Sequence, residues 1–286
     1  MLTAIGTMGS LMLVLATLLV IASKKLTVDE DPRTDIVEEI LPGANCGACG
    51  YIGCRQFAEA LVKGQAAPGK CSVSSTAEKE RVARFLQVDV GDVSQRVARL
   101  ACAGANNVAR WRAHYTGIPS CRAAAQVAGG AKGCSWGCLG FGDCETACTF
   151  DAIVMNRHSL PEVIEDKCTA CGDCVQACPK DLFSLHPVNH RLWVACKNQE
   201  FGDGVLADCE VACTACGRCA MDAPDELVVI RDNLAVINYH KDYHTRVPIE
   251  RCPTGAIVWI EAGGTTVKGR EAKRILRQHE LAPRPG

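Results

Sequence analysis

The sequence predicts an α+β protein in which one membrane-spanning helix precedes several small domains that depend on bound metal. Three observations lead to this prediction: the chain begins with an uncharged apolar run, 20 of its 286 residues are cysteine, and only 5% are aromatic. Small domains with few large apolar side chains usually need disulfides or metal for stability. A net charge of −1 excludes a strongly basic nucleic-acid-binding protein, and a hydrophobic content of 48% excludes an intrinsically disordered chain.

The apolar run at the N-terminus predicts a retained membrane anchor over residues 1–25. Residues 2–22 carry no charged side chain, and as a helix they would be about 30 Å long, enough to cross a bilayer core. Lys24 and Lys25 follow the run, whereas a cleaved signal before a secreted, disulfide-bonded protein carries its positive charge in front. The positive-inside rule then places the remaining chain in the cytoplasm, where disulfides are disfavoured. We therefore expect the cysteines to bind metal.

The first cysteine group lies in a glycine-rich loop, within a module expected over residues 33–90. Its spacing is C-x2-C-x4-C-x16-C, and its members are Cys46, Cys49, Cys54 and Cys71. Glycines let the backbone wrap closely around a bound group and direct N–H groups at sulfur. Phe57, Ala60 and Leu61 share one face of a short predicted helix that ends near Gly64. A four-thiolate zinc site is the alternative, but the tight loop favours a bulkier iron–sulfur cluster.

The second group predicts a two-cluster unit over residues 131–190. The run C-x2-C-x2-C-x3-C-P starts at Cys168 and is typical of bacterial ferredoxins, in which the fourth cysteine binds the other cluster. A partner set, C-x3-C-x5-C-x3-C, starts at Cys134, although Thr149 stands where proline is usual. Zinc does not need such an interleaved pattern. One cluster is expected on Cys134, Cys138, Cys144 and Cys178. The other is expected on Cys148, Cys168, Cys171 and Cys174.

The third group fits the same ferredoxin template after the loss of one cluster. It predicts a degenerate one-cluster domain over residues 191–262, with ligands at Cys213, Cys216, Cys219 and Cys252. The other template positions, which would all have bound the same cluster, are occupied by Ala223, Asp242, Thr245 and Pro248. Loss of one complete ligand set indicates that the remaining set is functional. Residues 226–239 read as two strands around Asp232-Asn233, the hairpin expected between the halves.

Four cysteines remain outside these groups, and residues 95–130, which include two of them, are expected to be a linking segment. The remaining cysteines are Cys102, Cys121, Cys196 and Cys209. Their number suits one more cluster, but their spacing matches no known motif. Buried, inert thiols are the alternative. The sequence therefore predicts four [4Fe–4S] clusters, or five if this last set also binds one.

No motif for a substrate-transforming active site is present. His240 and His244 are four residues apart but do not form an HExxH motif, so we expect surface residues. The chain also lacks a dinucleotide fingerprint and a phosphate-binding loop. A basic tail is expected over residues 263–286, with a helical stretch over 268–277 that lies on a partner, on anionic lipid or in solvent. Clusters without a substrate site are one-electron carriers, so the simplest function is electron transfer from a soluble donor to membrane partners.

Two stretches of the chain are distinctive in combination. One is LPGANCGACGYIGC with QFAEALVKG and GKC, and the other is CRAAAQVAGGAKGCSWGCLGFGDCETAC followed by CTACGDCVQACPKDL. Together they resemble the long form of the B subunit of the Rnf-type ion-translocating ferredoxin:NAD oxidoreductases, over residues 1 to about 260. The departures from the family pattern are at Thr149, Ala223, Asp242, Thr245 and Pro248.

The resemblance implies an electron-transfer subunit of a translocase, without an active site of its own. Reduced soluble ferredoxin would donate electrons, and flavin-bearing membrane subunits would use them for NAD reduction coupled to Na⁺ or H⁺ transport. The protein would sit in the bacterial inner membrane by a single lipid-embedded helix, with its iron–sulfur domains on the cytoplasmic side and no nucleic-acid partner. Two alternatives without ion pumping are a membrane-anchored polyferredoxin that reduces a regulator, and a donor to a reductase of aromatic or corrinoid substrates.

Overall fold

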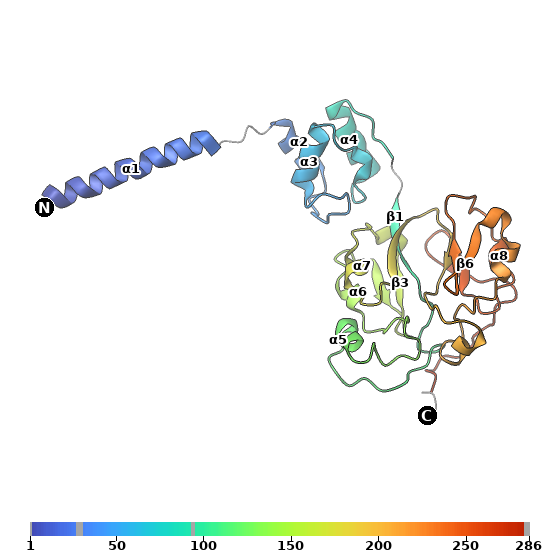
Figure 1. Cartoon of the computed structure of the whole chain (residues 1–286). Helices are drawn as coiled ribbons and strands as arrows, with labels where there is room; N and C mark the ends of the chain where they lie inside the picture. Colours follow the sequence, from blue (N-terminus) through green and yellow to red (C-terminus); the bar gives the residue numbers. More distant parts are fainter. Residues whose placement is uncertain (1, 27–30, 93–94, 283–286) are drawn as a thin grey trace.

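The computed structural model of the chain describes residues 2–26, 31–92 and 95–282. It shows an N-terminal helix, a small helical module and a larger part built from short strands, turns and helices (Figure 1). The mixed helix and strand content agrees with the predicted α+β class. The last four residues of the predicted tail lie outside the described residues.

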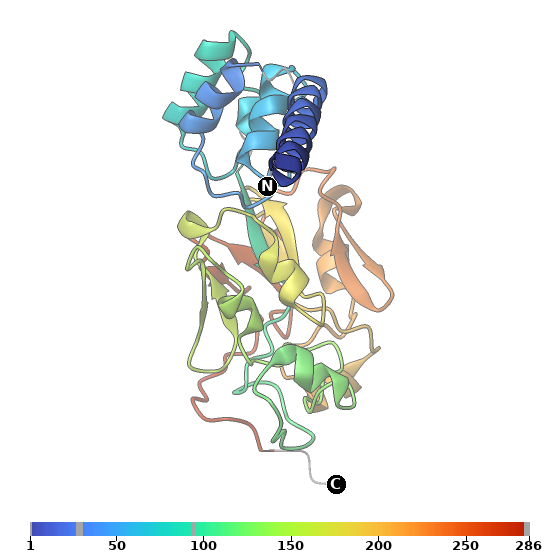
Figure 2. The same ribbon diagram turned by 90° about the vertical axis from the view of Figure 1, so that its left-hand side faces the viewer.

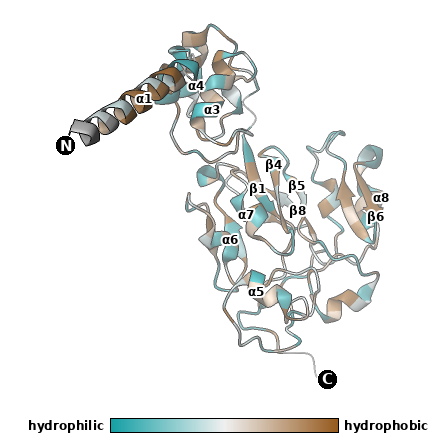
Figure 3. Ribbon diagram, turned by 60° about the vertical axis from the view of Figure 1, so that its left-hand side comes forward, coloured by the Kyte–Doolittle hydropathy of each residue, from teal (hydrophilic) through white to brown (hydrophobic). Residues whose placement is uncertain are grey.

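Helix α1 (Leu2–Leu26) extends away from the rest of the protein (Figure 1) and is seen nearly end-on in Figure 2. Its window Met8–Lys25 has a mean hydropathy of 1.6, and none of it is buried against other parts of the structure. Figure 3 shows apolar residues along much of this helix. Lys24 and Lys25 lie in its last turn, where cations interact favourably with the helix dipole. By length and composition, α1 is able to cross a membrane.

The helical module packs three helices around a small apolar core. Its elements are α2 (Arg33–Ile40), α3 (Cys54–Val62), a 3-10 helix (Pro68–Lys70) and α4 (Thr76–Leu86). The predicted helix after Cys54 is confirmed: the core includes Phe57 and Leu61 of α3, together with Val37 of α2 and Val82 of α4. A capping box starts α4, because the Ser75 hydroxyl accepts from the Glu78 N–H and the Glu78 carboxylate accepts from the Ser75 N–H.

The middle of the chain forms two small antiparallel sheets. Strand β1 (Arg96–Leu100) pairs with β4 (Phe183–Pro187), and β2 (Ile153–Met155) pairs with β3 (Pro161–Val163). The helical elements are α5 (Cys121–Gln126), α6 (Asp143–Thr146), a 3-10 helix (Glu165–Lys167) and α7 (Asp173–Ala177). Because β1 belongs to residues 95–130, the expected linking segment supplies a strand of this part. Ala98 of β1 lies in the same core as Cys144 and Cys174.

The C-terminal third contains a three-stranded sheet and a hairpin. Strand β8 (Ile257–Ile260) lies between β5 (Leu192–Val194) and β9 (Thr266–Val267), while β6 (Val228–Arg231) pairs with β7 (Leu234–Ile237). The predicted hairpin is confirmed, with positive φ at both Asp232 and Asn233, as a two-residue turn between twisted strands requires. The helical elements are α8 (Arg218–Asp222) and 3-10 helices at Asp203–Ala207, Pro224–Glu226 and Val247–Ile249.

The helical stretch expected over residues 268–277 is wrong, since none of these residues is helical. The chain instead runs along the protein and exchanges hydrogen bonds with it. Arg277 contacts the Glu210 carboxylate and the Asn107 carbonyl oxygen, and the Leu281 N–H donates to the Asn106 carbonyl. The helix was expected because the residues of this stretch favour helices locally. Contacts with residues far away in the sequence hold the stretch in a non-helical path instead, and helix propensity does not take such contacts into account.

Candidate metal centres

Five cavities are each lined by four cysteines, and together they account for all 20. None of the 20, which all lie in the described ranges, forms a disulfide. Each cavity has a volume of about 310–360 Å³, part of which is open to solvent. No group of three or more His, Cys, Asp or Glu side chains within the described part of the chain is arranged to hold a single metal ion. Four thiols that surround a cavity are suited to binding a group of several atoms, which is larger than a single metal ion.

The N-terminal site is formed by Cys46, Cys49, Cys54 and Cys71, the set expected from the sequence. The Asn45 side chain orders its loop by accepting from the N–H of Cys54 at 2.8 Å, at the start of α3. A Cβ at Gly53 would lie 2.9 Å from that Asn45 oxygen, so a larger residue there would displace the Asn45 side chain. Burial raises the pKa of the Cys49 thiol, and the Tyr51 N–H opposes that rise. Phe57 of α3 closes the apolar side of the cavity.

The α7 site is also the set that spacing predicted. Its cysteines are Cys148, Cys168, Cys171 and Cys174. The Ala98 N–H of β1 donates to the Cys168 sulfur at 3.4 Å, and the Ala152 N–H donates to the Cys148 sulfur at 3.3 Å. Burial raises the pKa of the Cys174 thiol to about 12. A thiolate at such a position becomes stable when it binds a cation.

The α5 site differs from the expected set by one member. It is lined by Cys121, Cys138, Cys144 and Cys178, so Cys121 stands where the sequence predicted Cys134. The reason is Asp143, at the start of α6. Its carboxylate accepts from the N–H groups of Cys121 and Arg122 at 2.8 and 3.0 Å, and from the Ser120 hydroxyl at 2.9 Å. Because Cys144 follows Asp143 directly, these bonds hold the N-terminus of α5 beside it.

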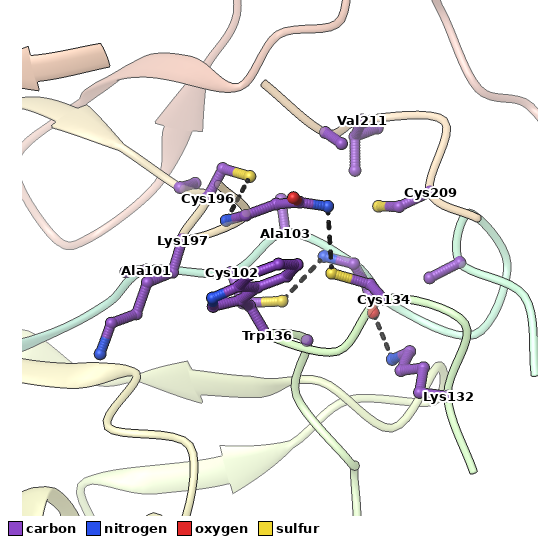
Figure 4. A pocket seen from close by; sticks show the side chains of 16 residues that line it. Ala101, Cys102, Ala103, Lys132, Cys134, Trp136, Cys196, Lys197, Cys209 and Val211 are labelled. Atoms are coloured by element: carbon purple, nitrogen blue, oxygen red, sulfur yellow. Dashed lines mark hydrogen bonds between the residues drawn. The ribbon is translucent and has the colours of Figure 1, made fainter. Parts of the chain in front are cut away.

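The central site contains Cys134 and three of the four cysteines that matched no motif. Its members are Cys102, Cys134, Cys196 and Cys209 (Figure 4). Burial raises the pKa of both the Cys196 and Cys209 thiols to about 12. The expected grouping of Cys121 with Cys102, Cys196 and Cys209 is therefore corrected by the exchange of Cys121 and Cys134.

The C-terminal site brings together the predicted set, Cys213, Cys216, Cys219 and Cys252. The positions at which the sequence predicted a lost cluster make other contacts. Pro248 is buried, whereas the side chains of Asp242 and Thr245 accept from the backbone N–H groups of His244 and Val247. His240 and His244 are exposed, as expected.

Two buried polar residues beside the central site were missed from the sequence. Lys132 is 1% exposed, and its ammonium donates to the carbonyl oxygens of Gly104 and Cys138 at 2.5 and 2.8 Å. Asn198 is also 1% exposed, and its amide donates to the Cys134 sulfur at 3.5 Å. Each lies two residues from a cysteine of the central site, and this closeness is the only feature of the sequence that could have indicated their position beside the cavity.

Direct contacts join the five sites in a series. The Ser72 hydroxyl, next to Cys71, donates to the Thr169 carbonyl oxygen, next to Cys168. Helices α6 and α7, which carry cysteines of the α5 and α7 sites, lie side by side (Figure 1). The N-terminal site is therefore followed by the α7 site and then by the α5 site. A backbone hydrogen bond from Cys138 to the Cys102 sulfur connects the α5 site to the central site, and one from Cys213 to the Cys196 sulfur connects the central site to the C-terminal site.

Two family models match segments that carry eight of these 20 cysteines. Residues 41–73 match the model described as "Putative Fe-S cluster", and residues 161–183 match the "4Fe-4S binding domain". Curated relatives align with nearly the whole chain. The B subunit of the Na⁺-translocating ferredoxin:NAD⁺ oxidoreductase complex of Acetobacterium woodii is 40% identical over 266 residues, which are 93% of this chain and 80% of that protein.

The chain belongs to the B-subunit family of the Rnf-type ion-translocating oxidoreductase complexes. The B subunit of the proton-translocating ferredoxin:NAD⁺ oxidoreductase complex of Clostridium ljungdahlii is 36% identical, over 88% of this chain and 89% of its own. The B subunit of the ion-translocating oxidoreductase complex of Methanosarcina acetivorans is 32% identical, over 90% and 97%. The resemblance stated from the sequence is confirmed, and iron–sulfur electron transport is the chemistry of this Rnf family.

Proposed function

We propose that this chain is the electron-input subunit of a membrane-bound complex that couples electron transfer from reduced ferredoxin to NAD with Na⁺ or H⁺ transport. Low-potential electrons enter the ferredoxin-like part and pass to flavin-bearing membrane subunits. The chain performs no substrate chemistry itself. The names of its relatives support the overall reaction, and the series of four-cysteine sites supports the role of a relay.

The serial arrangement of the sites is the observation that carries this proposal. Electron tunnelling falls steeply with distance, so a relay needs neighbouring redox groups rather than isolated ones. Bound [4Fe–4S] clusters supply one-electron carriers, and the chain provides thiols, apolar walls and N–H donors to hold them. The N–H···S bonds at Cys148 and Cys168 stabilise the more negative, reduced state.

We assign the exit to the N-terminal site, because it is nearest in sequence to α1. Helix α1 holds the chain at the bilayer, and Lys24 and Lys25 favour a cytoplasmic location for everything that follows. Electrons then enter at the ferredoxin-like units over residues 131–262, which a soluble donor is able to reach. This direction places membrane acceptors next to the module over residues 33–90.

Replacing Cys49 by alanine tests the assigned exit. We expect Cys49→Ala in the assembled complex to reduce ferredoxin-dependent NAD reduction to background, because one ligand of the N-terminal site is lost. The clusters of the other sites should still become reduced by ferredoxin, as followed by electron paramagnetic resonance. Ile52→Ala is the matched control, since this side chain is 84% exposed in the same loop. Normal NAD reduction by Cys49→Ala would reject the assigned path.

A further inference from the structure

The central site has the construction of a cluster-binding cavity, although no sequence motif predicts it. Its four cysteines come from segments that are far apart in the chain, and their side chains line one cavity of about 350 Å³ (Figure 4). The other four cavities have volumes of about 310–360 Å³, and the N-terminal one is lined by residues within a segment that matches an iron–sulfur family model. The central cavity is therefore of the same size as cavities with recognisable cluster ligands.

The sulfur atoms of the central site accept hydrogen bonds from five N–H groups. Cys102 accepts from the backbone N–H groups of Gly104 and Cys138, at 3.3 and 3.5 Å. Cys196 accepts from those of Asn198 and Cys213, at 3.5 and 3.4 Å. The Asn198 side chain donates to Cys134. Such donors stabilise sulfur that carries negative charge, as a cluster ligand does, far more than a neutral thiol.

The buried lysine beside the cavity also indicates a negatively charged occupant. The acceptors of the Lys132 ammonium are the neutral carbonyl oxygens of Gly104 and Cys138, and the side chain is 1% exposed. A buried cation without a negative partner is costly. An anionic cluster in the cavity would balance the charge of the Lys132 ammonium.

We propose that Cys102, Cys134, Cys196 and Cys209 bind a fifth [4Fe–4S] cluster, which connects the two-cluster unit to the C-terminal unit. The connection follows from two backbone contacts. Cys138, a member of the α5 site, donates its N–H to Cys102, and Cys213, a member of the C-terminal site, donates its N–H to Cys196. The central site therefore touches both neighbours through the residues that form them.

The cluster in the central site transfers one electron at a time. It would accept one electron as a cluster in one adjacent site is oxidised by one electron, and it would be reoxidised as it passes that electron to the cluster in the other adjacent site. No proton, bond or leaving group is involved. This relay role rests on the proposed function, whereas binding of the cluster does not, so the two can fail separately.

Iron and acid-labile sulfide per chain give the first test. The full-length chain, purified anaerobically in detergent, should hold about 20 iron ions, four for each of five clusters. About 16 iron ions, or zinc at the central site, would overturn the proposal. A chain with the full iron content whose complex does not oxidise ferredoxin would support the fifth site and reject the proposed function. An active complex whose chain lacks the fifth cluster would reject the fifth site and support the proposed function.

Matched double variants test which cysteines belong together. Cys102→Ala/Cys134→Ala should lose about four iron ions and keep the magnetic interaction between the reduced clusters of the α5 and α7 sites. Cys121→Ala/Cys144→Ala should lose about the same amount and abolish that interaction. Ile118→Ala, at a residue that is 71% exposed before α5, controls for handling losses. If the first variant abolished the interaction, or kept its full iron content, the grouping would be wrong.

Asn198→Asp provides a test that does not remove a ligand. It replaces the donor to the Cys134 sulfur with a carboxylate of nearly the same shape, so the iron content should stay unchanged. The reduction potential of one cluster should shift downward, because the cluster loses a hydrogen bond and gains a negative neighbour. Unchanged potentials for all clusters would overturn the proposal even if the double variants failed to fold.

Discussion

Replacing Arg99 by methionine is expected to destabilise the ferredoxin-like part by about 3–5 kcal/mol, because the carboxylate of Glu165 would stay buried without its partner. The two side chains form an ion pair in which each is 6% exposed. Arg99 lies on β1, and Glu165 lies in the 3-10 helix that leads to Cys168. The pair therefore holds the first strand of this part against the loop of the α7 site, where Ala98 donates to the Cys168 sulfur.

Guanidinium denaturation, followed by the visible absorbance of the clusters, measures this loss as a lower midpoint. Arg218→Met is the matched control, because its ion pair with Glu271 is about half exposed on both sides, and such pairs contribute about 0–1 kcal/mol. The double variant Arg99→Met/Glu165→Gln should recover much of the stability, since no charge is left buried. Equal midpoints for Arg99→Met and Arg218→Met would contradict the prediction.

Replacing Lys132 by glutamine is expected to lower the reduction potentials of clusters in the α5 and central sites. The ammonium lines the central cavity and is hydrogen-bonded to Cys138 of the α5 site. It therefore favours the reduced clusters, which carry one more negative charge. A unit charge placed about 7 Å from a cluster would contribute about 2 kcal/mol at an effective dielectric constant of about 20. For a one-electron couple this corresponds to a shift of about 90 mV, since a tenfold change is about 59 mV.

An anaerobic redox titration with detection by electron paramagnetic resonance measures both potentials. The N-terminal site serves as the internal reference, because its cysteines and Lys132 line different cavities. Glutamine keeps an N–H donor for the carbonyl oxygens of Gly104 and Cys138, so the shift reports the lost charge. Lys132→Met removes the donor as well and should add a loss of stability of about 1–3 kcal/mol. Unchanged potentials in the glutamine variant would show that the ammonium has no electrostatic role.

Local sequence patterns predicted the features that form within short stretches of chain. Helix α3 follows from the apolar face of Phe57, Ala60 and Leu61, and the β6–β7 hairpin follows from Asp232-Asn233. Both depend on backbone preferences and on neighbours a few residues away. The basic tail shows the limit of such patterns, because its ion pair with Glu210 and its hydrogen bonds to the backbone of Asn106 and Asn107 involve partners far away in the sequence.

The same distinction applies to the cysteines. Close spacing in the sequence brings Cys168, Cys171 and Cys174 together, and the ferredoxin template predicts the fourth member. The sequence alone therefore predicted this cavity-lining set, along with the N-terminal and C-terminal sets. The assignment of Cys121 and Cys134 depended on the tertiary structure. Asp143 binds the start of α5 and brings Cys121 to Cys144, while Asn198 donates to Cys134. These bonds join residues that are 22 and 64 positions apart, and no rule based on spacing along the chain includes contacts that only folding creates.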